Sequence, residues 1–148
     1  MTWLEGFLRR HRRIALDTNI FIYQLEANPR YADLTDQVFA WLERRNQTGV
    51  TSTITMTELL VEPYRRQDEH QVDEFYGLLS TYPNLNWIAP SLRIADTAAK
   101  IRAAHRLRTP NALQAATAIH SDATGLITND PIFERVKEFE TLVLGHLL

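Results

Sequence analysis

Cysteine is absent from the 148 residues of this sequence. Disulfide bonds, zinc–thiolate centres and thiol catalysis are therefore excluded. A bound metal would have to be held by oxygen or imidazole ligands, which favour Mg²⁺, Mn²⁺ or Ca²⁺. The lack of thiols thus limits the metal sites that this chain can form.

Long apolar runs and a strong charge of one sign are also missing. No stretch approaches the roughly 18 apolar residues of a membrane-spanning helix, so we expect no membrane partner. The N-terminal segment lacks the order of basic and apolar regions that marks a signal peptide, and we expect a cytoplasmic protein. The formal net charge of −2 gives no general attraction for nucleic acid, so a basic surface would have to be local.

The residues that are present indicate one globular domain over residues 1–148. Hydrophobic residues make up 45% of the chain and charged residues 23%, as in ordinary globular domains of this length. Short apolar segments alternate with segments of helical periodicity, which predicts an α/β fold with a mostly parallel sheet of about four to five strands. The predicted strands are residues 14–16, 50–55, 85–89, 125–128 and 141–144.

The stretch IALDTNIFIY, residues 14–23, places Asp17 directly after the first predicted strand. Ligands of open α/β sheets bind beyond the carboxyl ends of the strands, so Asp17 is a candidate catalytic or metal-binding residue. Asp is also an ordinary helix N-cap, and for Asp17 alone the cap is the stronger interpretation.

Two further acids follow predicted strands. Glu58 follows the second strand, although Thr55 and Glu58 also match the S/T-x-x-E pattern of a capping box. Asp130 follows the fourth strand and precedes Pro131, where it could again be an N-cap. The recurrence favours a shared site for Asp17, Glu58 and Asp130. Because gathered carboxylates repel each other, such a site calls for a cation or for raised pKa values of the acids. A divalent cation could activate water at a phosphate.

Basic residues concentrate in two places. Arg102, Arg106 and Arg108 lie on or just after a predicted helix over residues 92–107, where they could contact RNA phosphates or simply face solvent. The segment 9–13 reads RRHRR and is expected to be solvated, with an RNA or partner contact as the alternative.

Four blocks of the sequence resemble the PIN-domain ribonucleases, most closely the VapC-type toxins of bacterial toxin–antitoxin pairs. In order, they are LDTNIFIY, TMTELLVEP, RTPNALQAATAIH and LITNDPIF, and they span nearly the whole chain. The resemblance implies a three-layer α/β/α fold and a Mg²⁺- or Mn²⁺-dependent endoribonuclease. It also implies a homodimer that a small antitoxin neutralises by covering the active site. Trp41, Phe39 and Tyr64 are candidate dimer contacts, with the core as the alternative for Trp41.

The resemblance assigns the catalytic and metal-binding acids to Asp17, Glu58 and Asp130. It assigns Asn19 and Thr128 to polar positions that orient carboxylates or water. The family usually has Asp where this chain has Asn111, just after Thr109 and Pro110, which predict an N-cap and the first helical position. Asn keeps the shape but loses the charge, so we expect weaker metal binding and slower cleavage, whether the Asn is natural or engineered.

Two other classes of function stay open beside the nuclease. A catalytically degenerate module would bind RNA or the antitoxin without cleaving, because of Asn111. Phosphotransferases of the haloacid-dehalogenase type need a second Asp two residues after the first, where this chain has Asn19. Response-regulator receivers need an acidic pair that is also missing, so both of these are minor alternatives.

Overall fold

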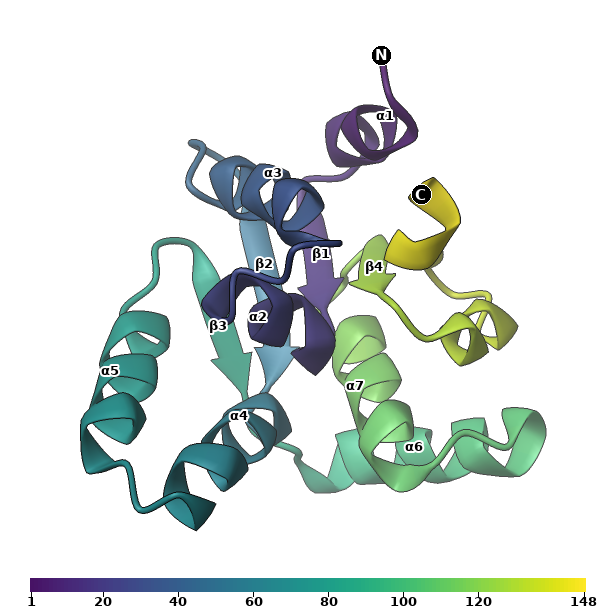
Figure 1. The fold of residues 1–148 in the computed structure, drawn as a ribbon. Coiled ribbons are helices and arrows are strands. Elements are labelled where there is room, and N and C mark those ends of the chain that lie inside the picture. The colour runs from purple at the N-terminus through teal and green to yellow at the C-terminus, as the bar shows by residue number, and fades with distance from the viewer.

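Five parallel strands form the centre of the computed structural model, which describes all residues from 1 to 148. Their order in the sheet is β3-β2-β1-β4-β5, with β1 in the middle (Figure 1). Every neighbouring pair is parallel, which confirms the predicted α/β class. The strands are β1 (Arg13–Leu16), β2 (Thr48–Ser52), β3 (Leu85–Ile88), β4 (Gly125–Thr128) and β5 (Glu140–Val143).

Seven α-helices and two 3₁₀ helices surround the sheet. None of the helices has both the length and the apolar character that crossing a membrane requires. The α-helices are α1 (Trp3–Arg10), α2 (Thr18–Leu25), α3 (Ala32–Leu42), α4 (Ile54–Arg65), α5 (Glu69–Ser80), α6 (Leu92–His105) and α7 (Thr109–His120). The 3₁₀ helices are η1 (Pro131–Arg135) and η2 (Leu144–Leu147).

Alternating residues of the central strand separate two hydrophobic cores. Ile14 and Leu16 belong to the core that includes side chains of α1, α2 and α3, whereas Ala15 belongs to the core of α6 and α7. This alternation is the period of a strand that is covered on both faces. The α7 core positions are alanines, and Ala112 and Ala115 are fully buried. The predicted three-layer α/β/α architecture is confirmed.

Two of the candidate dimer contacts are core residues instead. Trp41 and Phe39 lie in α3 and are almost completely buried within the subunit. Phe39 packs edge-on against Phe21 of α2 and against Tyr82. Of the two interpretations of Trp41, core and dimer interface, the structure confirms the core. The prediction that Phe39 contacts a second subunit is wrong, because periodicity alone does not distinguish a core face from an interface. Tyr64 is exposed.

Helices α4 and α7 begin at other residues than the sequence predicts. Thr55 is not the N-cap of a capping box, because α4 begins at Ile54 and β2 already ends at Ser52. The N-cap of α7 is Arg108 rather than Thr109, since Arg108 is extended and its carbonyl accepts a hydrogen bond from the Ala112 amide. Pro110 is accordingly the second residue of α7.

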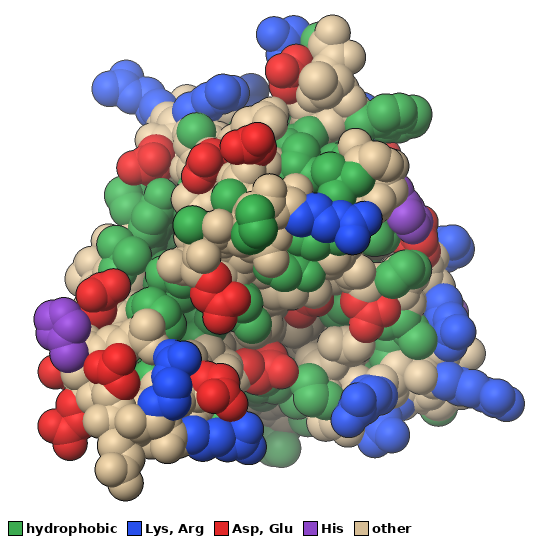
Figure 2. Space-filling view, in the orientation of Figure 1, with side chains coloured by type: hydrophobic (Ala, Val, Ile, Leu, Met, Phe, Trp, Pro, Cys, Tyr) green, Lys and Arg blue, Asp and Glu red, His purple; other side chains and the backbone are tan.

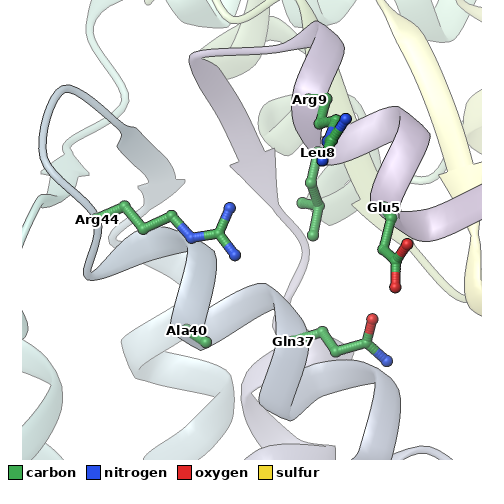
Figure 3. Close-up of a pocket in the computed structure, with 6 residues that line it drawn as sticks. All are labelled: Glu5, Leu8, Arg9, Gln37, Ala40 and Arg44. Carbon is green, nitrogen blue, oxygen red and sulfur yellow. The ribbon is translucent and has the colours of Figure 1, made fainter. Parts of the chain in front are cut away.

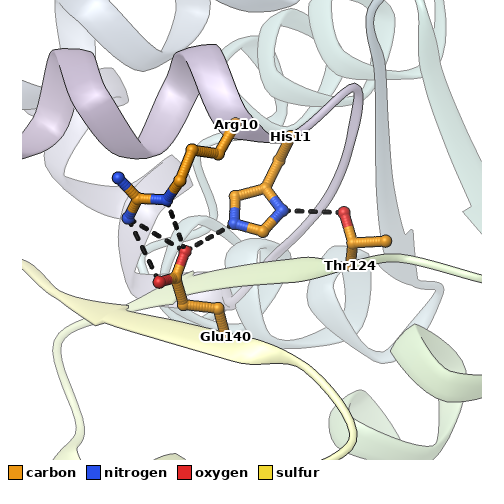
Figure 4. Close-up of polar contacts among 4 residues, drawn as sticks. All are labelled: Arg10, His11, Thr124 and Glu140. Carbon is orange, nitrogen blue, oxygen red and sulfur yellow. Dashed lines mark hydrogen bonds and ion pairs between the residues drawn. The ribbon is translucent and has the colours of Figure 1, made fainter.

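The basic segment before β1 is partly paired rather than freely solvated. His11 contacts Glu140 of β5 through Nε2 at 2.6 Å and Thr124 through Nδ1 at 2.7 Å (Figure 4). Arg10 donates to the same carboxylate, with its shortest contact at 3.0 Å. These contacts fasten α1 to the edge strand β5, at the amino ends of the strands.

Candidate active site

Asp17 lies where β1 ends and α2 begins, at the carboxyl edge of the central strand. Its Oδ1 accepts a hydrogen bond from the Thr18 amide at 2.8 Å, and its Oδ2 accepts one from the Thr128 hydroxyl at 2.7 Å. Only 7% of the residue is exposed. Asp17 is therefore the N-cap of α2 and, at the same time, a buried carboxylate at the edge where open α/β sheets bind ligands.

Burial raises the pKa of Asp17 from its usual 3.8 to about 6. Hydrogen bonds from Thr128 and Thr18 oppose this rise, while the negative charges of Glu58 and Asp130 add to it. An electrostatic effect of both acids on a buried carboxyl means that the three groups share one neighbourhood. This effect is the one that gathered carboxylates were expected to show.

Asp130 follows β4 and is held by three contacts. Its amide donates to the Thr128 hydroxyl at 3.0 Å, so Thr128 touches both Asp130 and Asp17. Its Oδ1 accepts from the Ile132 amide, which makes Asp130 the N-cap of η1 as well. Its Oδ2 lies 3.4 Å from Nδ2 of Asn111, which donates from the first turn of α7. The structure thus brings Asp17, Thr128, Asp130 and Asn111 together.

Glu58 lies in the second turn of α4 and is exposed. Its Oε1 accepts a hydrogen bond of 2.7 Å from the hydroxyl of Thr18, the residue next to Asp17. A pocket of about 200 Å³ between α2, α4 and α5 is lined in part by Glu58. Figure 2 shows acidic side chains around a hollow bounded by α2, α4 and α7.

Several polar residues beneath Glu58 were not predicted from the sequence. Thr18, Thr51, Thr55 and Gln114 are buried, and their side chains contact one another. Four threonines within TSTITMT, residues 51–57, could have signalled a hydroxyl cluster, because threonine is unusual in a core without partners. Asn19 was predicted to orient water or carboxylates, and its Oδ1 is a buried acceptor without a donor in the protein.

The donor atoms at this edge fit a hard divalent cation by their chemistry. Asp17, Glu58 and Asp130 offer carboxylate oxygens, which Mg²⁺ and Mn²⁺ prefer. A cation would also offset the repulsion that Glu58 and Asp130 exert on Asp17. Nowhere in the chain do three or more Asp, Glu or His side chains form a group that could hold a metal ion. Metal ligation by these acids therefore stays a prediction.

The three arginines predicted to contact RNA differ in their surroundings. Arg102 donates from Nε to the Leu107 carbonyl at 3.0 Å and from its Nη1 to the Thr109 hydroxyl at 2.8 Å, so its guanidinium stabilises the turn between α6 and α7. Arg106 and Arg108 are exposed and have no acidic partner within 4.0 Å. Figure 2 shows Lys and Arg side chains over α6 and α7, beside the acidic hollow.

A separate pocket lies between α1 and α3 (Figure 3). It has a volume of about 390 Å³ and shares no lining residue with the predicted site. Its lining consists of Glu5, Leu8, Arg9, Gln37, Ala40 and Arg44. We do not assign the predicted chemistry to this pocket, because it contains none of the acids at the carboxyl edge of the sheet.

The chain is similar to a known protein family and to several solved structures. The family model described as PIN domain matches residues 14–139. No curated protein is similar enough to match the chain. A toxin–antitoxin complex from Klebsiella pneumoniae contains a chain that is 27% identical, with a TM-score of 0.68, and the match covers 88% of this chain and 96% of that one.

Two other solved structures show the same fold at lower identity. VapBC-1 from nontypeable Haemophilus influenzae contains a chain with 23% identity and a TM-score of 0.68, and the match covers 90% of this chain and 98% of that one. VapBC2 from Rickettsia felis, solved with a DNA fragment from its promoter, contains a chain with 20% identity and a TM-score of 0.67. That match covers 88% of this chain and 98% of the other.

Proposed function

Because the chain belongs to the PIN-domain family, we propose that it is a divalent-metal-dependent endoribonuclease and the toxin of a toxin–antitoxin pair. The observation that carries this proposal is the buried carboxyl of Asp17, whose pKa is raised to about 6 by burial and by its acidic neighbours Glu58 and Asp130. Such a group at the carboxyl edge of a parallel sheet is typical of a catalytic site rather than of a helix cap alone.

The protein's own residues would prepare this site for phosphodiester hydrolysis. Thr128 and the Thr18 amide fix both oxygens of Asp17, and the Ile132 amide fixes one oxygen of Asp130. Mg²⁺ or Mn²⁺ bound by Asp17, Asp130 and Glu58 would supply activation of water and neutralise charge on the phosphate. The oxygens of Asp17 and Asp130 need little reorganisation before the reaction, because the fold already holds them.

Asn111 would weaken this site by replacing a negative charge with a hydrogen-bond donor. Its Nδ2 faces Asp130 Oδ2 at 3.4 Å, where an Asp would instead add a fourth carboxylate. A charge removed about 4 Å from a dication lowers the attraction by several kcal/mol at an effective dielectric near 20. We therefore expect Asn111→Asp to increase Mn²⁺ affinity and RNA cleavage by at least about tenfold.

The test compares this chain with Asn111→Asp on structured RNA in Mg²⁺ or Mn²⁺, each with and without EDTA. Asp17→Ala in both backgrounds is the control for contaminating nuclease. Chelator-sensitive cleavage that disappears with Asp17→Ala supports the nuclease. Cleavage that persists in Asp17→Ala would contradict it. Equal cleavage by this chain and by Asn111→Asp would show that the third acidic position is dispensable.

The contact between Asn111 and Asp130 also favours a second candidate, a module that binds RNA or an antitoxin without cleaving. In this case the Nδ2 of Asn111 occupies the side of Asp130 that a cation would otherwise approach. Tight binding of RNA by this chain without metal-stimulated cleavage, together with cleavage that Asn111→Asp restores, would favour this candidate.

An antitoxin and a second copy of the chain are the partners that we propose. The support is the similarity to a chain in the toxin–antitoxin complex from Klebsiella pneumoniae. Among the predicted dimer contacts, the exposed Tyr64 is the one that remains available to a second subunit. Arg106 and Arg108 are the residues that we propose for holding the RNA backbone, since both guanidiniums are free of acidic partners.

A further inference from the structure

Helix α7 contributes a second side-chain amide to the carboxyl edge of the sheet, one turn after Asn111. Gln114 is only 3% exposed, yet both ends of its amide are hydrogen-bonded. Oε1 accepts from the Ser52 amide at 3.2 Å, and Nε2 donates to the Thr55 hydroxyl at 2.6 Å. Because a backbone N–H can only donate, the orientation of this amide is fixed and Nε2 faces Thr55.

A continuous set of contacts leads from Gln114 to Glu58. The Thr55 hydroxyl lies 3.1 Å from the Thr18 hydroxyl, and Thr18 in turn donates to Glu58 Oε1 at 2.7 Å. Thr55 also lies 2.8 Å from the Thr51 hydroxyl. All three threonines are buried, so each contact replaces a bond to water.

The number of protons on these hydroxyls determines which group donates in each contact. Each hydroxyl has one proton, and that of Thr51 is donated to the Leu16 carbonyl, which can only accept. Thr55 accepts from Gln114, so its own proton is shared between Thr51 at 2.8 Å and Thr18 at 3.1 Å. Thr18 then directs its proton to Glu58. The donors thus run from α7 to Thr55 on α4, where they branch toward Thr51 and Thr18. The branch through Thr18 ends at the exposed Glu58 carboxylate.

We propose that Gln114 is a positioning residue for Glu58, acting through Thr55 and Thr18. Hydrogen bonds in such a chain strengthen one another, and outer groups of this kind orient the residues that bind a metal. Without the Gln114 amide, the Thr55 hydroxyl loses its donor and can accept the proton of Thr18. That proton is the one that Glu58 otherwise receives. The Glu58 carboxylate, which is exposed, would then leave its contact with Thr18.

This inference rests on the proposed role of Glu58 as an acid of the active site, and it adds a residue that acts without touching the reacting groups. It also assigns related roles to both amides of α7. Asn111 donates directly to Asp130, and Gln114 donates indirectly toward Glu58. One helix therefore supplies an N–H group to Asp130 directly and another to the threonines that lead to Glu58.

Gln114→Met tests the proposal, because Met has a similar size and shape but no amide. We expect the side chain of Glu58 to lose its contact with Thr18 in crystals of the metal-free variant, and the Mn²⁺ dissociation constant from calorimetry to rise about tenfold or more. The matched control is Thr117→Val, which removes a buried hydroxyl of α7 that bonds only to the Leu113 carbonyl. This control should leave both measurements unchanged.

Thr55 supplies a second test that does not depend on the folding of the Gln114 variant. Thr55→Val should release Glu58 as Gln114→Met does, whereas Thr55→Ser keeps the hydroxyl and should retain the wild-type Mn²⁺ affinity. The double variant Gln114→Met/Thr55→Val should bind Mn²⁺ no more weakly than Thr55→Val alone, since both changes break the same chain of contacts.

The outcomes separate this inference from the proposed function. If Glu58 keeps its contact with Thr18 and the Mn²⁺ affinity is unchanged in Gln114→Met, the role of Gln114 is overturned. An additive loss in the double variant would also overturn it. If Glu58 is released in the variant but the wild-type protein binds no Mn²⁺, the role of Gln114 stands and the metal-dependent function fails.

Discussion

At the scale of single residues, Asp17 shows that a helix cap and an active-site acid can be the same group. The sequence offered these as alternatives, and the structure shows the cap: Oδ1 accepts from the Thr18 amide. The other oxygen accepts from Thr128, which in turn accepts from the Asp130 amide. A helix cap needs only one carboxylate oxygen, so the second one is available for a site shared with Asp130.

Asp17→Asn is expected to stabilise the metal-free protein at neutral pH. Burial raises the pKa of Asp17 from 3.8 to about 6, so its protonated form favours the folded state. That contribution is complete below about pH 4 and is lost as the pH rises through about 6. The difference between the two pKa values corresponds to about 3 kcal/mol of folding stability that the wild type loses at neutral pH. Asn avoids this loss because it carries no charge.

Urea unfolding of both proteins in EDTA from pH 4 to 8 provides the measurement. The variant should match the wild type at the acidic end and exceed it by up to about 3 kcal/mol above pH 7. A constant difference between the unfolding free energies of the two proteins from pH 4 to 8 would contradict the prediction. It would show that ionisation of Asp17 does not lower the stability of the fold. Asp73→Asn, at an exposed position of α5, is the control for a generic loss of one carboxylate.

At the scale of elements, the position of a helix start decides what its threonines can do. The S/T-x-x-E pattern suggested that Thr55 caps its helix, but α4 begins at Ile54 and the Thr55 hydroxyl bonds to other elements. A local pattern contains no information about Gln114, which is 59 residues away. The strands and the order of helices follow from periodicity, whereas this contact follows from packing.

The contacts of Arg10 and His11 with Glu140 join the end of α1 to β5, and their strength depends on charge. The hydrogen bond from His11, together with Arg10, lowers the pKa of Glu140 against the opposing effect of burial. Because the Glu140 side chain is 45% exposed, we expect Glu140→Gln to cost only about 1 kcal/mol at pH 7. For a chain of this length, such a loss lowers the melting temperature by about 2–4 °C.

The pH dependence of this variant has the opposite sign to that of Asp17→Asn. A lowered pKa means that Glu140 stabilises the fold above its usual value near 4.5, and that this stabilisation is lost as the pH falls through the lowered pKa. Thermal unfolding at pH 7 and at pH 3 measures the effect. Glu134→Gln, an exposed acid of η1, is the matched control. A difference that persists undiminished at pH 3 would contradict the ion-pair explanation.

At the scale of the whole molecule, the charges behind the net charge of −2 are unevenly distributed over the surface. Acidic side chains lie around the hollow between α2, α4 and α7, and basic side chains lie beside it over α6 and α7 and also over α4 (Figure 2). A polyanion attracted to the basic region would be held next to the acids, while the acids themselves would require a cation. Overall charge is therefore a poor guide to whether this protein binds RNA.

Arg106→Gln/Arg108→Gln is expected to weaken RNA binding similarly for all sequences. Each lost phosphate contact reduces the slope of log affinity against log salt by about 0.7 for single-stranded RNA. Fluorescence anisotropy in EDTA, where cleavage is suppressed, measures the affinity at several salt concentrations. Arg93→Gln, an exposed arginine at the other end of α6, should leave the slope unchanged. An unchanged slope in the double variant would exclude this surface as the RNA contact.

The sequence by itself determined the α/β class, the five strands and the acids that follow three of them. Each of these follows from local patterns, namely the alternation of apolar residues, the residues that break helices and strands, and the residue type at a strand end. Tertiary structure alone decided that Trp41 is core, that Arg102 stabilises a turn, and that Gln114 reaches Thr55. These outcomes depend on which distant segments meet, as with Asp17 and Thr128, which are 111 residues apart. Only packing brings such partners into contact.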